Sequence, residues 1–200
     1  MNYVIIGNGT AAVGTIEGIR AVDQKGTITV ISEEPYHVYG RPLISYLLLG
    51  KTTEDKMLLY RPTDFYEKNG VTTLLGRKAV RIDPTAKAVK LEDGTSVPYD
   101  KLCICTGSRP FVPPMAGLDT VENKTSFMTL DDAKHLDAML GSENDKRVLI
   151  IGAGLIGLKC AEGIYQRVKE PTVIDLAPRI LPNVLTEVPA SIIQKHIESK

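Results

Sequence analysis

A glycine-rich turn occurs twice in this chain, each time between an apolar strand and a helix. The first copy reads Val4-Ile5-Ile6-Gly7-Asn8-Gly9-Thr10-Ala11-Ala12, and the second reads Val148-Leu149-Ile150-Ile151-Gly152-Ala153-Gly154-Leu155-Ile156-Gly157. In such a Gly-x-Gly-x-x-Gly/Ala turn the backbone can approach a pyrophosphate, and the helix N-terminus supplies N–H donors and positive dipole. The strand and helix around each copy make the motif specific. The sequence therefore predicts two dinucleotide sites.

Composition narrows the partners. Lys plus Arg and Asp plus Glu both number 24, and no basic stripe is interleaved with aromatic residues, so nucleic acid is excluded as a partner. No apolar run approaches the ~18–20 residues that span a bilayer. The segment from Met1 to Ile6 enters the first turn without a basic leader. We expect a cytoplasmic protein of one or two domains that does not bind membranes.

The three cysteines, Cys103, Cys105 and Cys160, have no framework spacing, which indicates reduced thiols. Cys103 and Cys105 alternate along one apolar run, so we expect them on the same sheet face, where they could not easily bridge each other. We interpret all three as small buried hydrophobic residues.

The first turn lies in a βαβ unit. We predict a strand over Asn2 to Ile6, a helix over Ala11 to Ala21 and a β-branched strand over Thr27 to Ile31. The second strand leads to Glu33, where an acid can reach a ribose hydroxyl. Glu33 is preferred over the adjacent Glu34.

The middle of the chain changes pattern several times. Breakers make residues 35–59 irregular around a helical stretch at 43–49, and a helix is expected within 61–69. Alternating apolar residues predict strands at 71–75, 78–82, 86–91 and 96–98, which we group as a small antiparallel meander with a hairpin turn at Asp93-Gly94.

The last part of the chain contains a second βαβ unit. Three segments precede it: a strand at 101–105, a linker with four Pro or Gly residues at 110–117, and a helix at 131–140. Residues 141–145 end that helix. The unit starts at Arg147, its second strand at 172–176 carries Asp175, and a last helix starts near Glu187. An acid at Asp175 favours NAD, because it accepts bonds from ribose hydroxyls and repels a 2′-phosphate. Arg179, just past this strand, keeps NADP open as an alternative.

The order of these parts resembles the FAD-dependent pyridine nucleotide-disulfide oxidoreductase superfamily over essentially the whole chain. The branch of rubredoxin reductases, oxygenase-coupled ferredoxin reductases and the N-terminal part of assimilatory nitrite reductases is the most similar. The resemblance is carried by the two turns together with Arg41-Pro42-Leu43-Ile44-Ser45, Thr106-Gly107-Ser108-Arg109-Pro110 and Arg179-Ile180-Leu181-Pro182.

The resemblance implies an α/β fold. A Rossmann-like FAD-binding βαβ domain with a three-stranded antiparallel meander, residues 1–112, would be followed by a partial second Rossmann-like NAD-binding domain, residues 113–200. The residues implied in FAD binding are Gly7, Gly9, Thr10, Ala11, Ala12, Glu33, Arg41, Pro42, Ala79, Val80, Thr106, Gly107, Ser108 and Arg109. Those implied in NAD(H) binding are Gly152, Gly154, Leu155, Ile156, Gly157, Lys159 and Asp175.

Three departures from the family pattern bear on chemistry. No cysteine lies between Glu33 and Lys51, where disulfide reductases carry a redox thiol, so a thiol relay is disfavoured. Tyr46 stands in place of a usual lysine near the flavin. Lys159 stands in place of a usual glutamate near the nicotinamide, and it is interpreted either as a ligand-facing cation or as a surface lysine.

Histidine offers no substitute chemistry, because the three histidines have no cysteine at ligand spacing and no metal site is expected. His37 lies nearest to the expected flavin region and is interpreted as a loop residue; the others are His135 and His196. No catalytic acid, base or nucleophile can be named.

The expected function is that of an FAD-dependent NADH:acceptor oxidoreductase, or its N-terminal part. NADH would reduce the flavin, and electrons would pass to a small redox protein, a small-molecule acceptor or a nitrite-reducing centre. Relatives of this kind are longer and complete the FAD domain after the NAD domain, so the chain is expected to be truncated, with a homodimer or a complementary chain as partner. The alternative is a non-catalytic dinucleotide-binding fragment or one half of a split flavoenzyme.

Overall fold

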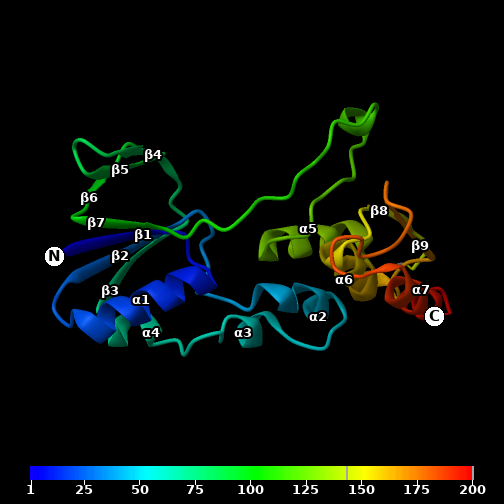
Figure 1. Cartoon of the computed structure of the whole chain (residues 1–200), viewed down its shortest axis with the longest axis horizontal. Coiled ribbons are helices and arrows are strands. Elements are labelled where there is room, and N and C mark those ends of the chain that lie inside the picture. The colour runs from blue at the N-terminus through cyan, green and yellow to red at the C-terminus, as the bar shows by residue number, and fades with distance from the viewer. Residues whose placement is uncertain (143, 200) are drawn as a thin grey trace. The chain divides into compact units, whose positions relative to one another are not determined.

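The computed structural model describes residues 1–142 and 144–199, which form two compact units. One unit comprises Met1–Gly40 and Asp55–Ser108, and the other comprises Arg41–Glu54 and Arg109–Lys200 (Figure 1). Packing thus joins residues 41–54 to the second unit, and the domain boundary expected after residue 112 stays a prediction. Glu143, inside the expected break at 141–145, and Lys200, the last residue of the expected second domain, lie outside the described residues.

The first unit is built on a parallel sheet with strand order β3-β2-β1-β7. The strands are β1 (Asn2–Ile6), β2 (Thr27–Ser32), β3 (Val71–Leu75) and β7 (Lys101–Ile104). Strand β1 lies inside the sheet between β2 and β7, and both pairings are parallel. A strand buried on both faces is apolar throughout, which explains the run Val4-Ile5-Ile6.

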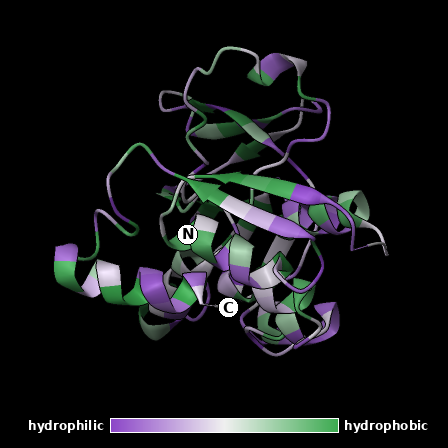
Figure 2. Ribbon diagram, turned by 90° about the vertical axis from the view of Figure 1, so that its right-hand side faces the viewer, coloured by the Kyte–Doolittle hydropathy of each residue, from purple (hydrophilic) through white to green (hydrophobic). Residues whose placement is uncertain are grey.

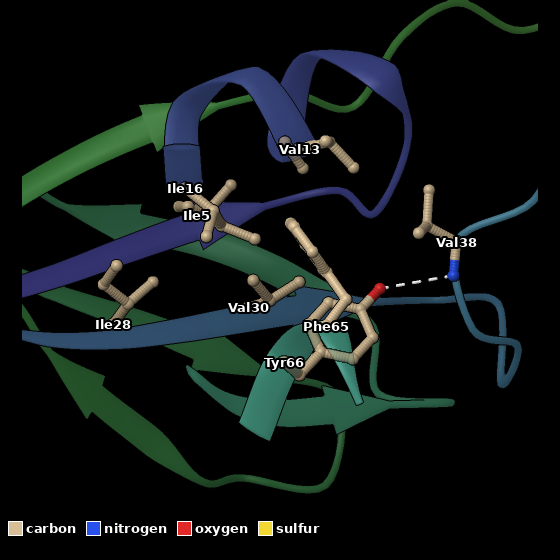
Figure 3. Close-up of a cluster of buried hydrophobic side chains, with 9 residues drawn as sticks. Ile5, Val13, Ile16, Ile28, Val30, Val38, Phe65 and Tyr66 are labelled. Carbon is tan, nitrogen blue, oxygen red and sulfur yellow. Dashed lines mark hydrogen bonds between the residues drawn. The ribbon is translucent and has the colours of Figure 1, made fainter. Parts of the chain in front are cut away.

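Two helices cover one face of this sheet. The helix α1 (Thr10–Val22) and the short α4 (Phe65–Lys68) pack against alternate residues of β1 and β2 (Figure 3). Val13 and Ile16 of α1 belong to the same buried cluster as Ile5 of β1. This layer holds the helix that follows the first glycine turn.

An antiparallel meander covers the other face. Its strands are β4 (Ala79–Asp83), β5 (Ala88–Leu91) and β6 (Ser96–Pro98), in the order β4-β5-β6. Val4 and Ile6, which point away from α1, form a cluster with Val89 and Leu91 of β5. The expected three-stranded meander is confirmed.

The grouping of residues 71–75 with that meander is wrong. Strand β3 pairs in parallel with β2, from Val71 beside Ile28 to Leu75 beside Ser32. Alternation within a strand reports which of its faces are buried, and it does not report which strand lies next to it. The helix expected within 61–69 is shorter than predicted, since within that segment only α4 is helical. The helix α3 (Glu54–Met57) was not predicted.

Arg20 ties the end of α1 to the α4–β3 connection. Its guanidinium donates to the carbonyls of Asn69, at 2.6 Å, and of Asp23 and Gly26, both at 2.9 Å. We expect Arg20→Met to lower the free energy of unfolding by about 2 kcal/mol, because charged donors to partly buried carbonyls are lost. Urea unfolding would measure this. Arg61→Met, which removes the exposed ion pair with Glu17, serves as the control, and an equal loss in both variants would contradict the assignment.

The second unit contains a two-stranded parallel sheet of β8 (Arg147–Ile151) and β9 (Glu170–Ile174). Strand β9 ends immediately before Asp175, two positions earlier than the expected strand at 172–176. The helices are η1 (Arg41–Leu43), α2 (Ile44–Leu48), η2 (Leu118–Thr120), α5 (Leu130–Leu140), α6 (Leu155–Ile164) and α7 (Glu187–Glu198).

A separate core holds this unit together. Leu48 of α2, Leu136 of α5, Ile150 of β8 and Ile164 of α6 belong to one buried cluster. The helices alternate hydrophobic and hydrophilic residues (Figure 2). Each glycine turn therefore has its own packed support.

Candidate functional site

The first glycine turn is shaped by a close backbone approach. Gly7 has φ +107°, and its N–H donates to the Ile31 carbonyl at 2.8 Å. A Cβ atom at Gly7 would lie within 3.0 Å of the Cys105 carbonyl and the Thr106 nitrogen. Only glycine satisfies both conditions, and the structure thereby brings two predicted site segments, the turn and Thr106, together.

The helix after this turn begins without a side-chain cap. Gly9 is the N-cap of α1 and no side chain bonds there, whereas Thr129 and Asp132 form a full capping box on α5. Thr10 and Ala11 are exposed, and a Cβ atom at Gly9 would meet no atom within 4 Å. The first N–H groups of a helix need a partner. Open space beside uncapped donors fits a bound pyrophosphate.

The second turn repeats this geometry. Gly152 has φ +111° and its N–H donates to the Ile174 carbonyl at 2.7 Å, while Gly154 opens α6 without a side-chain cap. Leu155 and Ile156 at the start of α6 are exposed. The second unit therefore carries an equivalent open helix N-terminus.

The third position distinguishes the two turns. A Cβ atom at Gly157 would lie within 3.0 Å of the Gly152 carbonyl, so α6 packs directly on the turn. In the first turn Ala12 occupies this position and is fully buried. Both residues satisfy the motif, but at this third position only the second turn requires glycine.

The two predicted ribose acids differ in their surroundings. Asp175 accepts hydrogen bonds from the N–H groups of Ala177 and Ala153, both at 2.7 Å, and these bonds lower the pKa of its carboxyl group. Glu33 is exposed and forms an ion pair with Lys78 at 3.2 Å. Asp175 directly follows Ile174, whose carbonyl accepts the N–H of Gly152. In the first unit the corresponding carbonyl is that of Ile31, and the residue that follows it is the buried Ser32.

We expect Asp175→Asn to lower stability and NADH affinity at pH 7 and to have a smaller effect in acid. A depressed folded-state pKa stabilises the fold above the unfolded value of 3.8 and loses that contribution as pH falls through the folded value. Urea unfolding at pH 7 and pH 3 would measure the difference between variant and wild type. A difference that is independent of pH would contradict the anionic role.

The predicted adenine-binding strand contains an irregularity. The pairing of β4 with β5 shifts register between Ala79 and Arg81, and the Val80 side chain is 54% exposed. A β-bulge leaves backbone N–H and C=O groups outside the regular strand pairing, and bulges often lie next to active sites. Gly107 and Ser108 follow β7 as exposed chain, with φ +68° at Gly107.

Arg41, Pro42 and Arg109, which were expected at FAD, belong to the second unit. Arg41 lies in η1, and its guanidinium donates to the Met128 carbonyl at 3.1 Å. Its side chain is therefore anchored within that unit.

Two departures from the family pattern contact each other. The Lys159 ammonium lies 4.5 Å from the centroid of the Tyr46 ring and forms an ion pair with Glu162. A cation over a tyrosine ring is stabilised by about 0.5–1 kcal/mol at an exposed site. Lys159 thus joins α6 to α2, a pairing that neither residue alone predicts.

A strained residue beside the second turn was missed by sequence reasoning. Leu181 has φ +49°, is buried, and donates its N–H to the Ala153 carbonyl at 2.8 Å. Arg179 donates to the carbonyls of Pro182, at 3.0 Å, and Leu185, at 3.2 Å. The segment Arg179-Ile180-Leu181-Pro182 is thereby folded against the turn. Its sequence carries part of the family resemblance, and no local pattern in it indicates the positive φ.

The thiols follow the predicted geometry in part. The sulfurs of Cys103 and Cys105 lie 3.5 Å apart, and both approach the Thr15 hydroxyl, so they share one sheet face as predicted. Both are half-buried, whereas Cys160 is buried and its pKa is raised to about 11 by that burial.

Three absences concern residues 1–142 and 144–199. No three His, Cys, Asp or Glu side chains in these ranges group as metal ligands. No helix in them combines the length and apolar character needed to cross a membrane. The Nε2 atom of His37 is buried and has no hydrogen-bond partner among the same residues.

Comparison with known proteins gives concordant matches. The family model of the pyridine nucleotide-disulphide oxidoreductases matches residues 1–200. The chain is 33% identical over 199 residues to the nitrite reductase [NAD(P)H] of Bacillus subtilis (strain 168), covering 98% of this chain and 24% of that protein. It is 30% identical over 200 residues to the rubredoxin-NAD(+) reductase of Pseudomonas putida, covering 100% of this chain and 51% of that protein.

A solved structure supports the same relationship. The covalent putidaredoxin reductase-putidaredoxin complex matches with 31% identity and a TM-score of 0.84, covering 98% of this chain and 47% of that one. The chain thus spans about half or less of the length of these relatives. FAD and NAD(H) are the cofactors of this group of enzymes, in agreement with the two turns. The chain belongs to the pyridine nucleotide-disulphide oxidoreductase family.

Proposed function

We propose that this chain is the N-terminal part of an FAD-dependent NADH:acceptor oxidoreductase. The observation that carries the proposal is the pair of glycine turns, each followed by a helix whose N-terminus has no side-chain cap. Such an N-terminus binds a pyrophosphate through its N–H groups and dipole. Two such helix N-termini in a member of this family support the binding of two dinucleotides, one that stays bound and one that exchanges with solvent.

We assign FAD to the first turn. Gly9 leaves room for the pyrophosphate, Glu33 would bind the adenosine ribose, and the bulge at Val80 offers backbone groups to the adenine. Thr106 lies beside Gly7, so the end of β7 would contact the same cofactor. From the family resemblance we also propose roles in FAD binding for Arg41, Pro42 and Arg109, and a division into an FAD-binding domain at 1–112 and an NAD-binding domain at 113–200.

We assign NADH to the second turn and favour it over NADPH. Asp175 is held as an anion by two backbone N–H groups, and an anion beside the ribose repels a 2′-phosphate. The Arg179 guanidinium already donates to two carbonyls of its own loop, and this supports NADH over NADPH.

The chemistry belongs to the cofactors, and the protein positions them. When bound, FAD supplies a group that accepts a hydride from NADH and passes electrons to an acceptor. The relatives include a rubredoxin-NAD(+) reductase and a nitrite reductase, so we propose a small redox protein or a nitrite-reducing centre as acceptor. With no cysteine between Glu33 and Lys51, electrons would leave the flavin without a thiol relay. The free thiols support a cytoplasmic location.

Anaerobic stopped-flow spectroscopy of the full-length protein tests the proposal. Addition of NADH should bleach the flavin absorption band, and NADPH should do so with at least tenfold lower kcat/KM. A protein that binds FAD and remains oxidised in the presence of NADH would contradict the assignment.

The contact of Lys159 with Tyr46 favours one competing function, a nucleotide-binding module without turnover. In this alternative Lys159 and Tyr46, which replace the residues usual in the family, would weaken hydride transfer. The purified protein would then bind ADP but would not retain flavin. A complementary chain that restores flavin binding on co-purification would instead identify a split enzyme.

A further inference from the structure

The side chain of Asn8, inside the first glycine turn, is bonded from outside the turn at both of its polar atoms. Its Oδ1 accepts a hydrogen bond from the Tyr66 hydroxyl at 2.6 Å, and its Nδ2 donates to the Tyr36 carbonyl at 3.1 Å. The Tyr66 oxygen also accepts the N–H of Val38 at 3.2 Å (Figure 3). These bonds connect the turn, α4 and the loop after β2 within the first unit.

Tyr66 is a rigid and persistent donor. It is only 9% exposed, its neighbour Phe65 belongs to the same core cluster, and the His37 ring lies 4.8 Å from its ring. Burial raises the pKa of the Tyr66 hydroxyl, so the proton that bonds Asn8 stays in place at neutral pH. In a buried network the loss of one partner leaves the other unsatisfied, which makes such bonds costly to remove.

The second turn has no equivalent side chain. Ala153 stands where Asn8 stands, and it is held through its backbone, which donates to Asp175 and accepts from Leu181. The other features of the two turns correspond, including the bonds from Gly7 and Gly152 to the preceding strands. The two sites therefore differ in whether a buried side chain of another helix fixes the turn.

We propose that Asn8 and Tyr66 form a brace that preorganises the first turn, and that Tyr66 is a positioning residue for the cofactor bound there. A preorganised site loses less entropy on binding, and the gain appears mainly as a slower dissociation rate. The brace slows release of the nucleotide from the first turn, whereas the second turn, which has no such side chain, releases its nucleotide faster. This inference rests on the proposed assignment of FAD to the first turn.

The rate of FAD release tests the brace. We would load the full-length protein with FAD, dilute it, and follow the recovery of free-flavin fluorescence in the wild type, Tyr66→Phe, Asn8→Ala and the double variant. Tyr66→Phe should release FAD about tenfold faster, because the hydrogen bond of about 1.4 kcal/mol that fixes Asn8 is lost. Asn8→Ala also loses the bond to the Tyr36 carbonyl and should release FAD at least as fast. The double variant should be no faster than Asn8→Ala alone, and the KM for NADH should not change.

Tyr3→Phe is the matched control. Its hydroxyl donates to Asp23 at 3.1 Å in the same unit, so the substitution removes a tyrosine hydrogen bond away from the turn. It should leave FAD release unchanged. Unaltered release in Tyr66→Phe, additive effects in the double variant, or equal acceleration in Tyr3→Phe would each overturn the brace. A wild type that binds no FAD would contradict the proposed function itself, and with it the brace.

Discussion

Gly9→Ala is expected to weaken FAD binding at least tenfold while leaving the first unit stable, and Gly7→Ala is expected to destabilise that unit strongly. A Cβ atom at Gly9 would meet no protein atom within 4 Å, so the apo protein should change in stability by no more than about 0.5 kcal/mol. The methyl group would occupy the space proposed for the pyrophosphate. We expect FAD affinity to fall at least tenfold, because bonds to a charged group are lost.

Gly7→Ala differs because its Cβ atom would collide with the backbone at Cys105 and Thr106, which cannot rotate away. The residue also has φ +107°, where alanine is strained. Together these effects should cost about 3 kcal/mol or more. Urea unfolding of the apo protein and a flavin-binding titration would measure the two properties separately.

Gly14→Ala is the control for both. Gly14 lies within α1, and a Cβ atom there would also meet no atom within 4 Å, so alanine should stabilise the helix by about 0.5–1 kcal/mol and leave FAD affinity unchanged. If Gly9→Ala retained FAD as well as Gly14→Ala does, the uncapped N-terminus of α1 would not be the pyrophosphate site.

The turns could be predicted from sequence because their requirements are local. A strand, a positive-φ glycine and a helix N-terminus occupy one short segment, and the structure has β1, α1 and β2 close to their expected limits. The placement of β3 was not predictable in the same way. Its pairing with β2 depends on the chain between them, and the sequence pattern of β3 is equally compatible with the meander.

The contacts around the turns were less predictable for the same reason. Tyr66 lies 58 positions from Asn8, and Lys159 is far from Tyr46 along the chain. Each residue taken alone is ordinary: a tyrosine in an amphipathic segment, an asparagine in a turn, a lysine on a helix. Only the packing of α4 on the first sheet, and of α2 on α6, creates these pairs.

Gly157→Ala is expected to disrupt the second turn and to raise the KM for NADH by at least tenfold, although alanine satisfies the motif and stands at the corresponding position, Ala12. The added methyl group would press on the Gly152 carbonyl and would lie 3.4 Å from the Ile150 side chain, so α6 must move away from the turn. Overpacking of this kind costs about 1–3 kcal/mol. FAD content should be unchanged, because a Cβ atom at Gly157 would contact Gly152 and Ile150 and none of the residues proposed to bind FAD.

Gly154→Ala separates packing from binding. No atom lies within 4 Å of a Cβ atom at Gly154, so the variant should fold as the wild type does and still lose NADH affinity, since its methyl group faces the open N-terminus of α6. Urea unfolding and steady-state kinetics with NADH would show a KM defect in both variants and a stability defect in Gly157→Ala alone. Equal stability of the two variants would mean that α6 can withdraw from Gly152 without cost, and the requirement for glycine at the third position would then be wrong.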